Sequence, residues 1–171
     1  MAEASRESRR AWVGLVGWIA LCFAAGAVGA FASHDVAPFY ASLVKPSWAP
    51  PASLFAPAWT VLYILMAVAA WLVWRERDLD EARALSRRQG LVLFVVQLAL
   101  NALWTWLFFA WRLGGAAMAE LVLLWIAVAI VARQFARVKA ISGWLLVPYL
   151  CWLIYAGALN WTVWRANQST F

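Results

Sequence analysis

Tryptophan, tyrosine and amide side chains are the groups in this sequence best suited to hold a small molecule. Trp104 and Trp152 fall well inside long apolar segments, where a buried indole N–H needs a hydrogen-bond partner. Either helix packing or a ligand cavity lined with aromatic rings explains these two positions. Gln97, Asn101 and Thr105 recur at every fourth residue, so they share one face of a helix. Interhelical hydrogen bonding is the plainest interpretation of this polar face.

Groups that catalyse reactions are scarce by comparison. The sequence has no evident Ser-His-Asp set, no paired carboxylates and no glycine-rich phosphate loop, and His34 is its one histidine. Cys22 and Cys151 both fall in apolar segments, so we expect two buried free thiols that behave as small hydrophobic groups. We therefore assign no catalytic residue from composition and expect neither a metal site nor a required cofactor.

A stiff loop with one tryptophan lies between the first two apolar segments. It reads Lys45-Pro46-Ser47-Trp48-Ala49-Pro50-Pro51. Its three prolines fix φ and remove backbone donors, so this stretch is not helical. A rigid aromatic loop at the mouth of membrane helices predicts a lid or a pocket wall.

The elements that position these groups are membrane-spanning helices. The chain is 66% hydrophobic and 13% charged, far more apolar than a soluble domain. A span needs about 20 apolar residues, and five segments qualify: 12–32, 54–74, 90–111, 115–133 and 143–164. We expect an all-α membrane protein with a single domain over residues 1–171, a lid-like loop at 33–53 and a polar loop from Arg75 to Gln89. The first segment is interpreted as a retained span rather than a cleaved signal peptide.

The basic residues predict an orientation. All but three of the 14 Lys and Arg residues fall on one side of a five-span topology, and the exceptions are Lys45, Arg112 and Arg165. The positive-inside rule then places the N-terminus in the cytoplasm and the C-terminus and the 33–53 loop outside it. The same rule explains the net charge of +6 without a nucleic-acid partner.

Several spaced motifs carry a family resemblance. The run from Phe39 to Pro51 resembles the signature of the translocator protein/tryptophan-rich sensory protein (TspO/MBR) family, also called the peripheral benzodiazepine receptor family. Further similar segments follow in the same order: Ala56–Tyr63, Gln97–Trp104, Pro148–Trp152, Leu159–Trp161 and Trp164–Arg165. The resemblance as a whole covers nearly everything from Trp12 to Asn167.

The resemblance implies a bundle of five transmembrane helices, often a homodimer, with a pocket that opens toward the loop between the first two helices. The family binds porphyrins and other tetrapyrroles, and many members bind isoquinoline carboxamide and benzodiazepine ligands. Eukaryotic members bind cholesterol, whereas bacterial members are linked to tetrapyrrole and stress regulation. Some promote light- and oxygen-dependent porphyrin breakdown. The short tail and the charge pattern favour a bacterial-type member in the cytoplasmic membrane.

Two positions depart from the family pattern. After Pro51 the family often has Arg-Trp, and this chain has Ala52-Ser53. A cholesterol-recognition pattern needs a tyrosine where this chain has Trp161, so we do not expect dedicated sterol binding.

The resemblance and the chemistry of a porphyrin together predict the site. A flat apolar ring suits an aromatic cavity with a few polar anchors, and Lys45 at its mouth is either a partner for a propionate or an interfacial anchor. The expected ligand-binding residues are Trp48 and Pro51 in the lid and Trp59, Tyr63, Asn101, Trp104 and Trp152 in the wall. The leading hypothesis is a membrane receptor or sensor for porphyrins, with protoporphyrin IX or a haem-like ring as ligand and membrane lipid and a second copy as partners. A porphyrin-degrading enzyme that uses Trp152 is the first alternative, and a small-molecule carrier is the second.

Overall fold

The computed structural model describes residues 2–32 and 36–171, without the side chains of residues 2–8, 36 and 37. Within these residues the chain is helical and contains no strand. The elements in order are α1 (Ala2–Ala32), α2 (Val36–Ser42), η1 (Ala52–Leu54), α3 (Phe55–Arg75), α4 (Glu81–Thr105), η2 (Trp106–Ala110), α5 (Gly114–Val138), α6 (Ala140–Trp144) and α7 (Val147–Ala166). The predicted all-α fold class is confirmed.

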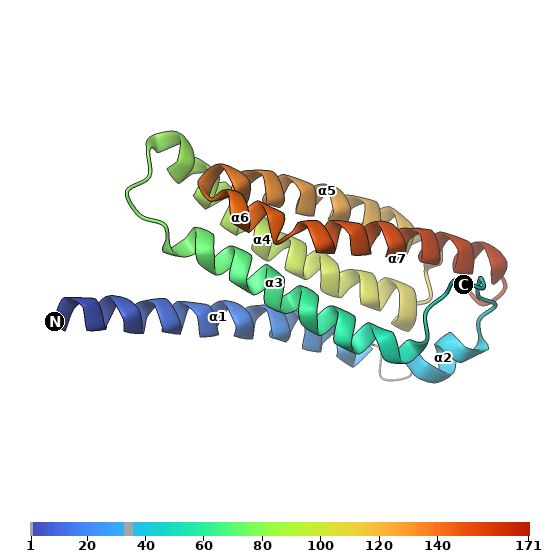
Figure 1. Ribbon diagram of the computed structural model, residues 1–171. Helices are drawn as coiled ribbons and strands as arrows, with labels where there is room; N and C mark the ends of the chain where they lie inside the picture. Colours follow the sequence, from blue (N-terminus) through green and yellow to red (C-terminus); the bar gives the residue numbers. More distant parts are fainter. Residues whose placement is uncertain (1, 33–35) are drawn as a thin grey trace.

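Within the described residues, five helical segments are long and apolar enough to span a membrane. They run Arg9–Ala32, Ala52–Arg75, Glu81–Ala110, Gly114–Val138 and Ala140–Ala166. Figure 1 shows the long helices lying side by side along one axis, with α2 at one end of the bundle and the α3–α4 connection at the other. In each segment, fewer than half of the residues in the most apolar stretch are buried inside the protein, and the first segment is the least buried. Wide apolar surfaces therefore face the surroundings. A bilayer satisfies such surfaces because its interior is apolar.

The predicted loop from Arg75 to Gln89 is wrong in its second half, because α4 already begins at Glu81. The Asp80 side chain accepts a hydrogen bond from the backbone N–H of Arg83 at 2.8 Å, and Glu81 lies in the first turn. An N-cap acceptor and an acidic first turn stabilise a helix start even where the residues are polar. The helix therefore extends past the apolar segment.

The predicted lid-like loop 33–53 contains two short helical elements, α2 and η1, while its residues 33–35 lie outside the described part of the chain. Tyr40 and Leu43 in and beside α2 are buried, and the Tyr40 hydroxyl donates to the Pro50 carbonyl at 3.0 Å. Lys45 donates from Nζ to the carbonyls of Tyr40 and Leu43, which satisfies acceptors at the end of α2. Residues 44–51 remain non-helical, as the prolines predict.

The core divides into two clusters. The larger cluster extends from the middle of the bundle toward the α3–α4 connection and includes Met66, Phe94, Phe135 and Tyr149. The smaller lies at the α2 end and includes Tyr40, Phe108, Ala117 and Val163. Of the two cysteines, Cys22 is buried as predicted, but Cys151 is exposed on the outer face of α7.

Candidate functional site

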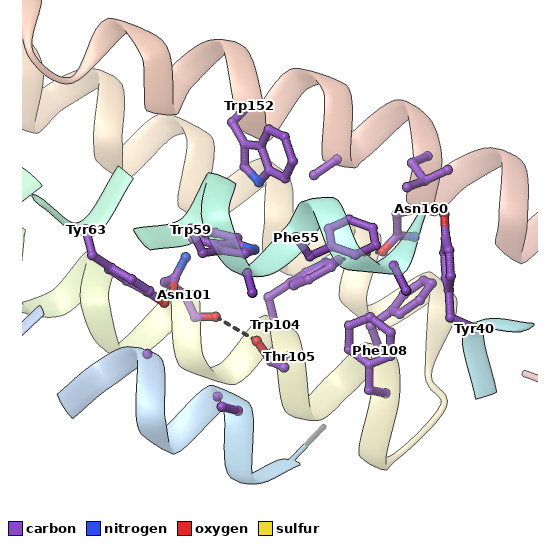
Figure 2. A pocket seen from close by; sticks show the side chains of 18 of the residues that line it. Tyr40, Phe55, Trp59, Tyr63, Asn101, Trp104, Thr105, Phe108, Trp152 and Asn160 are labelled. Carbon is purple, nitrogen blue, oxygen red and sulfur yellow. Dashed lines mark hydrogen bonds between the residues drawn. The ribbon is translucent and has the colours of Figure 1, made fainter. Parts of the chain in front are cut away.

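An aromatic cavity of about 490 Å³ opens at the α2 end of the bundle. Its wall combines residues from α1, α3, α4, η2 and α7, with Tyr40 from α2 and Ala52 from η1. Figure 2 shows the labelled rings of α3, α4 and α7 facing this space from different sides. The lining is Phe23, Gly26, Ala27, Gly29, Ala30, Tyr40, Ala52, Phe55, Ala56, Trp59, Thr60, Tyr63, Asn101, Trp104, Thr105, Phe108, Phe109, Trp152, Tyr155, Ala156, Leu159, Asn160 and Val163.

The rings around the cavity pack against one another. Trp59 stacks on Tyr63 with centroids 5.5 Å apart and meets Trp152 edge-on at 6.2 Å. Trp104 stacks on Phe108 at 5.4 Å. These distances fall in the range of favourable aromatic pairs, so the contacts hold the rings in fixed orientations.

Asn101 connects three helices through its side-chain amide. The Tyr63 hydroxyl of α3 donates to Asn101 Oδ1 at 2.8 Å, and Asn101 Nδ2 donates to the Tyr149 hydroxyl of α7, also at 2.8 Å. All three side chains are buried. Interhelical hydrogen bonding is thus the role of this amide, as the polar face of the sequence predicts. Of its neighbours on this face, Thr105 bonds to the Asn101 carbonyl of its own helix. Gln97 donates from Nε2 to Met66 Sδ of α3 at 3.9 Å, while its Oε1 has no partner among the described residues.

A second amide supports the other side of the cavity. Trp104 Nε1 donates to Asn160 Oδ1 at 3.3 Å, and Asn160 Nδ2 donates to the Gly114 carbonyl at the start of α5. The indole N–H of Trp104, which is half-buried, therefore has a hydrogen-bond partner on another helix. Trp104 contributes to both helix packing and the cavity wall.

Two tryptophans in the cavity wall have an indole N–H that is not used in a hydrogen bond with a described residue. Trp59 and Trp152 line the cavity, and within the described part of the chain neither indole N–H makes a hydrogen bond. Figure 2 shows both rings at the edge of the space that the wall encloses. A ligand acceptor entering the cavity would satisfy these N–H groups.

The predicted lid residues lie outside the wall. Trp48 is 46% exposed and packs on Tyr155 with ring centroids 5.7 Å apart, while the Tyr155 hydroxyl donates to the Trp48 carbonyl at 3.2 Å. Pro51 is exposed and precedes η1. Neither predicted lid side chain lines the space, and the loop is joined to the cavity wall through Tyr155 of α7, which does line it.

Asn167 fastens this loop to the last helix. Its Oδ1 accepts the Val44 backbone N–H at 2.8 Å, and its Nδ2 donates to the Val44 carbonyl at 2.9 Å and to the Val163 carbonyl at 2.7 Å. The side chain is 7% exposed. One buried amide thus forms hydrogen bonds with both backbone groups of Val44 and joins the loop to the end of α7.

Of the seven residues predicted to bind the ligand, the cavity brings together Trp59, Tyr63, Asn101, Trp104 and Trp152. Sequence reasoning missed Phe55, Phe108 and Tyr155. Tyr155 follows Trp152 by three positions on the same helix face, a signal that was available. Phe108 reaches the wall through the π-helical turn η2, which no sequence pattern announced.

The cavity is lined by neutral side chains. None of the lining residues carries a charge. Lys45 is committed to backbone carbonyls, and the Arg112 guanidinium lies over the Phe39 ring at 5.0 Å. Burial, with a smaller contribution from Tyr155, raises the pKa of Tyr40, so its hydroxyl stays a neutral donor.

The TspO/MBR family model matches residues 18–165. The chain belongs to the TspO/MBR family. With five candidate spans, this TspO/MBR chain is an integral membrane protein, and the resemblance inferred from its motifs is confirmed.

Relatives of this TspO/MBR chain cover most of its length. It is 40% identical over 154 residues to the tryptophan-rich protein TspO of Chlorobaculum tepidum, covering 87% of this chain and 92% of that protein. It is 44% identical over 146 residues to protein CrtK of Rhodobacter capsulatus, covering 85% and 88%. It is 37% identical over 158 residues to the translocator protein of Bos taurus, covering 92% of each.

Proposed function

We propose that this protein is a membrane receptor or sensor that binds porphyrins and related flat hydrophobic ligands in the aromatic cavity. The observation that carries the proposal is the wall itself, in which Trp59, Trp104 and Trp152 from three helices face one space of about 490 Å³. Small-molecule sites typically measure roughly 300–1,000 Å³ and combine apolar walls with few polar groups.

The chemistry of the wall supports a flat aromatic ligand. Ring faces and edges recognise an extended π-system, and the unused indole N–H groups of Trp59 and Trp152 are donors for an acceptor atom on it. The ligand class itself comes from the family resemblance. Among the curated relatives, one from Cereibacter sphaeroides is named a tryptophan-rich sensory protein, which agrees with a sensing role.

The absence of charge among the lining residues sharpens the proposal. Ring stacking and burial, rather than ion pairs, would provide most of the affinity. We therefore expect protoporphyrin IX and its dimethyl ester to bind about equally, within roughly threefold, a difference of less than about 1 kcal/mol.

A titration in detergent, in the dark, tests the proposal through the Soret band of protoporphyrin IX. Replacing Trp59→Ala or Trp152→Ala removes a ring without removing a hydrogen bond within the protein, and each should weaken binding about tenfold or more. Trp161→Ala is the matched control, because Trp161 lies on the same helix as Trp152, is 50% exposed and does not line the cavity. Thermal melts of each variant check the fold.

Wild-type affinity in both cavity variants would refute this site. Illumination separates the enzymatic alternative from a receptor. If bound porphyrin is converted to product in light by the wild type but not by Trp152→Phe, the protein is a photo-oxidative enzyme rather than a binding protein alone.

A further inference from the structure

A second cavity, the arginine pocket, lies at the opposite end of the bundle. It measures about 430 Å³ and is lined by Arg10, Ala11, Trp74, Arg75, Arg77 and Arg87. These residues come from α1, the end of α3, the α3–α4 connection and α4. Figure 1 shows this region, where the end of α3 lies between α1 and the connection that leads to α4, far from α2.

The arginines of this pocket lack acidic partners. Among the side chains that the structure describes, none of the four pairs with a carboxylate. Of the acids in the α3–α4 connection, Glu76 pairs with Lys139 and Asp80 with Arg83, and Asp78 forms no ion pair with a described residue. Four guanidinium groups around one cavity repel one another, so a bound anion would lower the energy of this arrangement.

Two of these arginines are held in place and two are free. Arg87 Nη1 donates to the Glu76 carbonyl at 2.8 Å, and the Arg75 guanidinium lies over the Trp71 ring at 4.6 Å. Arg10 and Arg77 make no hydrogen bond, ion pair or ring contact with any described residue. Their donors are available for a ligand, and the planar arginine fork matches the oxygens of a phosphate.

The walls of the pocket are fixed by close helix packing. Trp71 Nε1 donates to the Ala11 carbonyl at 2.8 Å, which joins α3 to α1. A Cβ added at Gly14 would lie 2.3 Å from the Trp74 ring, so α1 crosses Trp74 at a position that only glycine fits. Arg10 and Arg75 are thus carried by two helices that pack closely against each other, while Arg77 follows in the connection that leaves α3.

The surroundings indicate a lipid. Next to Arg10, α1 exposes Trp12, Val13 and Val16, which are 66%, 66% and 62% exposed. An acyl chain lying on this apolar strip places its phosphate at the level of the pocket. This is also the basic end of the chain, which the positive-inside rule puts at the cytoplasmic leaflet, where anionic lipids attract arginine clusters.

We propose that the arginine pocket binds the phosphate headgroup of an anionic phospholipid. The proposal is independent of porphyrin binding, because the two cavities lie at opposite ends of the bundle. Free phosphate shares the headgroup chemistry but lacks the acyl chain that the apolar strip of α1 would hold.

Native mass spectrometry of the full chain in detergent tests this, with phosphatidylglycerol, phosphatidylcholine and inorganic phosphate as separate probes. We expect the wild type to retain phosphatidylglycerol at least about tenfold better than phosphatidylcholine, and inorganic phosphate neither to bind measurably nor to displace the lipid. The double variant Arg10→Gln, Arg77→Gln should lose about tenfold in affinity for phosphatidylglycerol, because it removes two sets of charge-assisted hydrogen bonds.

The matched control is Arg133→Gln, Arg137→Gln, which removes the same charge from the end of α5 outside the pocket. It should keep the affinity of the wild type. A second measurement guards against misfolding: phosphatidylglycerol should raise the melting temperature of the wild type and the control but not of the pocket variant. Equal losses in both double variants would overturn the proposal in favour of general surface electrostatics. Inorganic phosphate that binds as well as the lipid would overturn the lipid assignment.

Discussion

For Asn101, the sequence predicted that the side chain would be buried and hydrogen-bonded, but it did not identify the bonding partners. Its place on a polar face of a span indicated a buried hydrogen bond, because an unpaired amide in an apolar interior is costly. The structure supplies the partners, the hydroxyls of Tyr63 and Tyr149 on two other helices. Removing this amide would leave two buried hydroxyl groups without their common partner, so Asn101 supports the cavity wall as well as lining it.

Glu120, in contrast to Asn101, is a buried polar residue for which the structure supplies no partner among the described residues. Its side chain is 6% exposed, and neither carboxylate oxygen has a hydrogen-bond partner in the described part of the chain. It forms no pair with Arg112, whose guanidinium lies over the Phe39 ring, and it does not cap the start of α5.

Replacing Glu120→Met should therefore stabilise the protein. Burying an unpartnered polar group costs about 1–3 kcal/mol, and a methionine of similar size avoids that cost. The midpoint of thermal unfolding in detergent should rise by several degrees. The control Glu81→Met alters an exposed carboxylate in the first turn of α4, where loss of a favourable helix-end charge should leave the midpoint unchanged or slightly lower. A lower midpoint for Glu120→Met would mean that the carboxylate has a stabilising role.

At the scale of elements, the loop after α2 depends on a contact that lies far away in sequence. Residues 44–51 have no regular structure of their own, yet Val44 is bonded through both backbone groups to Asn167 at the end of α7. The Pro50 carbonyl is held in addition by Tyr40. These polar contacts hold the backbone of the loop in place at the α2 end of the bundle.

Asn167→Ala should loosen the loop. Both bonds to Val44 are lost, so amide hydrogen exchange in a peptide covering residues 43–54 should speed up about tenfold, as expected for about 1–1.5 kcal/mol of local stability. Asn167→Asp keeps the acceptor for the Val44 N–H and should show a smaller change. Exchange in Asn167→Ala equal to that of the wild type would show that other contacts hold the loop.

Glycine sets how closely the elements approach. A Cβ at Gly26 would lie 2.6 Å from the Tyr63 ring, so α1 packs against α3 at the polar chain that Asn101 organises. A glycine inside an apolar span is a local signal for close backbone approach, but it does not identify the neighbour, which here is a ring in the cavity wall.

At the scale of the whole molecule, the distribution of basic residues gives an orientation that can be measured. A reporter fused after Phe171 that is active only outside the cytoplasm should be active, and a cytoplasmic reporter at the same position should be silent. Fusion of the same pair within the α3–α4 connection, beside Arg77, should give the reverse result and serves as the internal control. Cytoplasmic activity at Phe171 would invert the topology. The homodimer implied by the resemblance remains a prediction.

The sequence by itself determined the membrane class, the five spans and the family. Hydrophobicity over about 20 residues is a local property, and a bilayer admits helices as the simplest spanning element. The spacing of Gln97, Asn101 and Thr105, and the tryptophans inside the spans, also followed from local periodicity.

Only the tertiary structure decided which side chains share the cavity. Trp48 and Pro51 were expected in the site and lie outside its wall, whereas Phe55, Phe108 and Tyr155 are part of it. The reason is physical: a side chain lines a cavity according to the rotation and separation of whole helices, and those depend on contacts such as Gly26 on Tyr63 and Asn167 on Val44. Such contacts join residues that are distant in the chain, so no local pattern reports them.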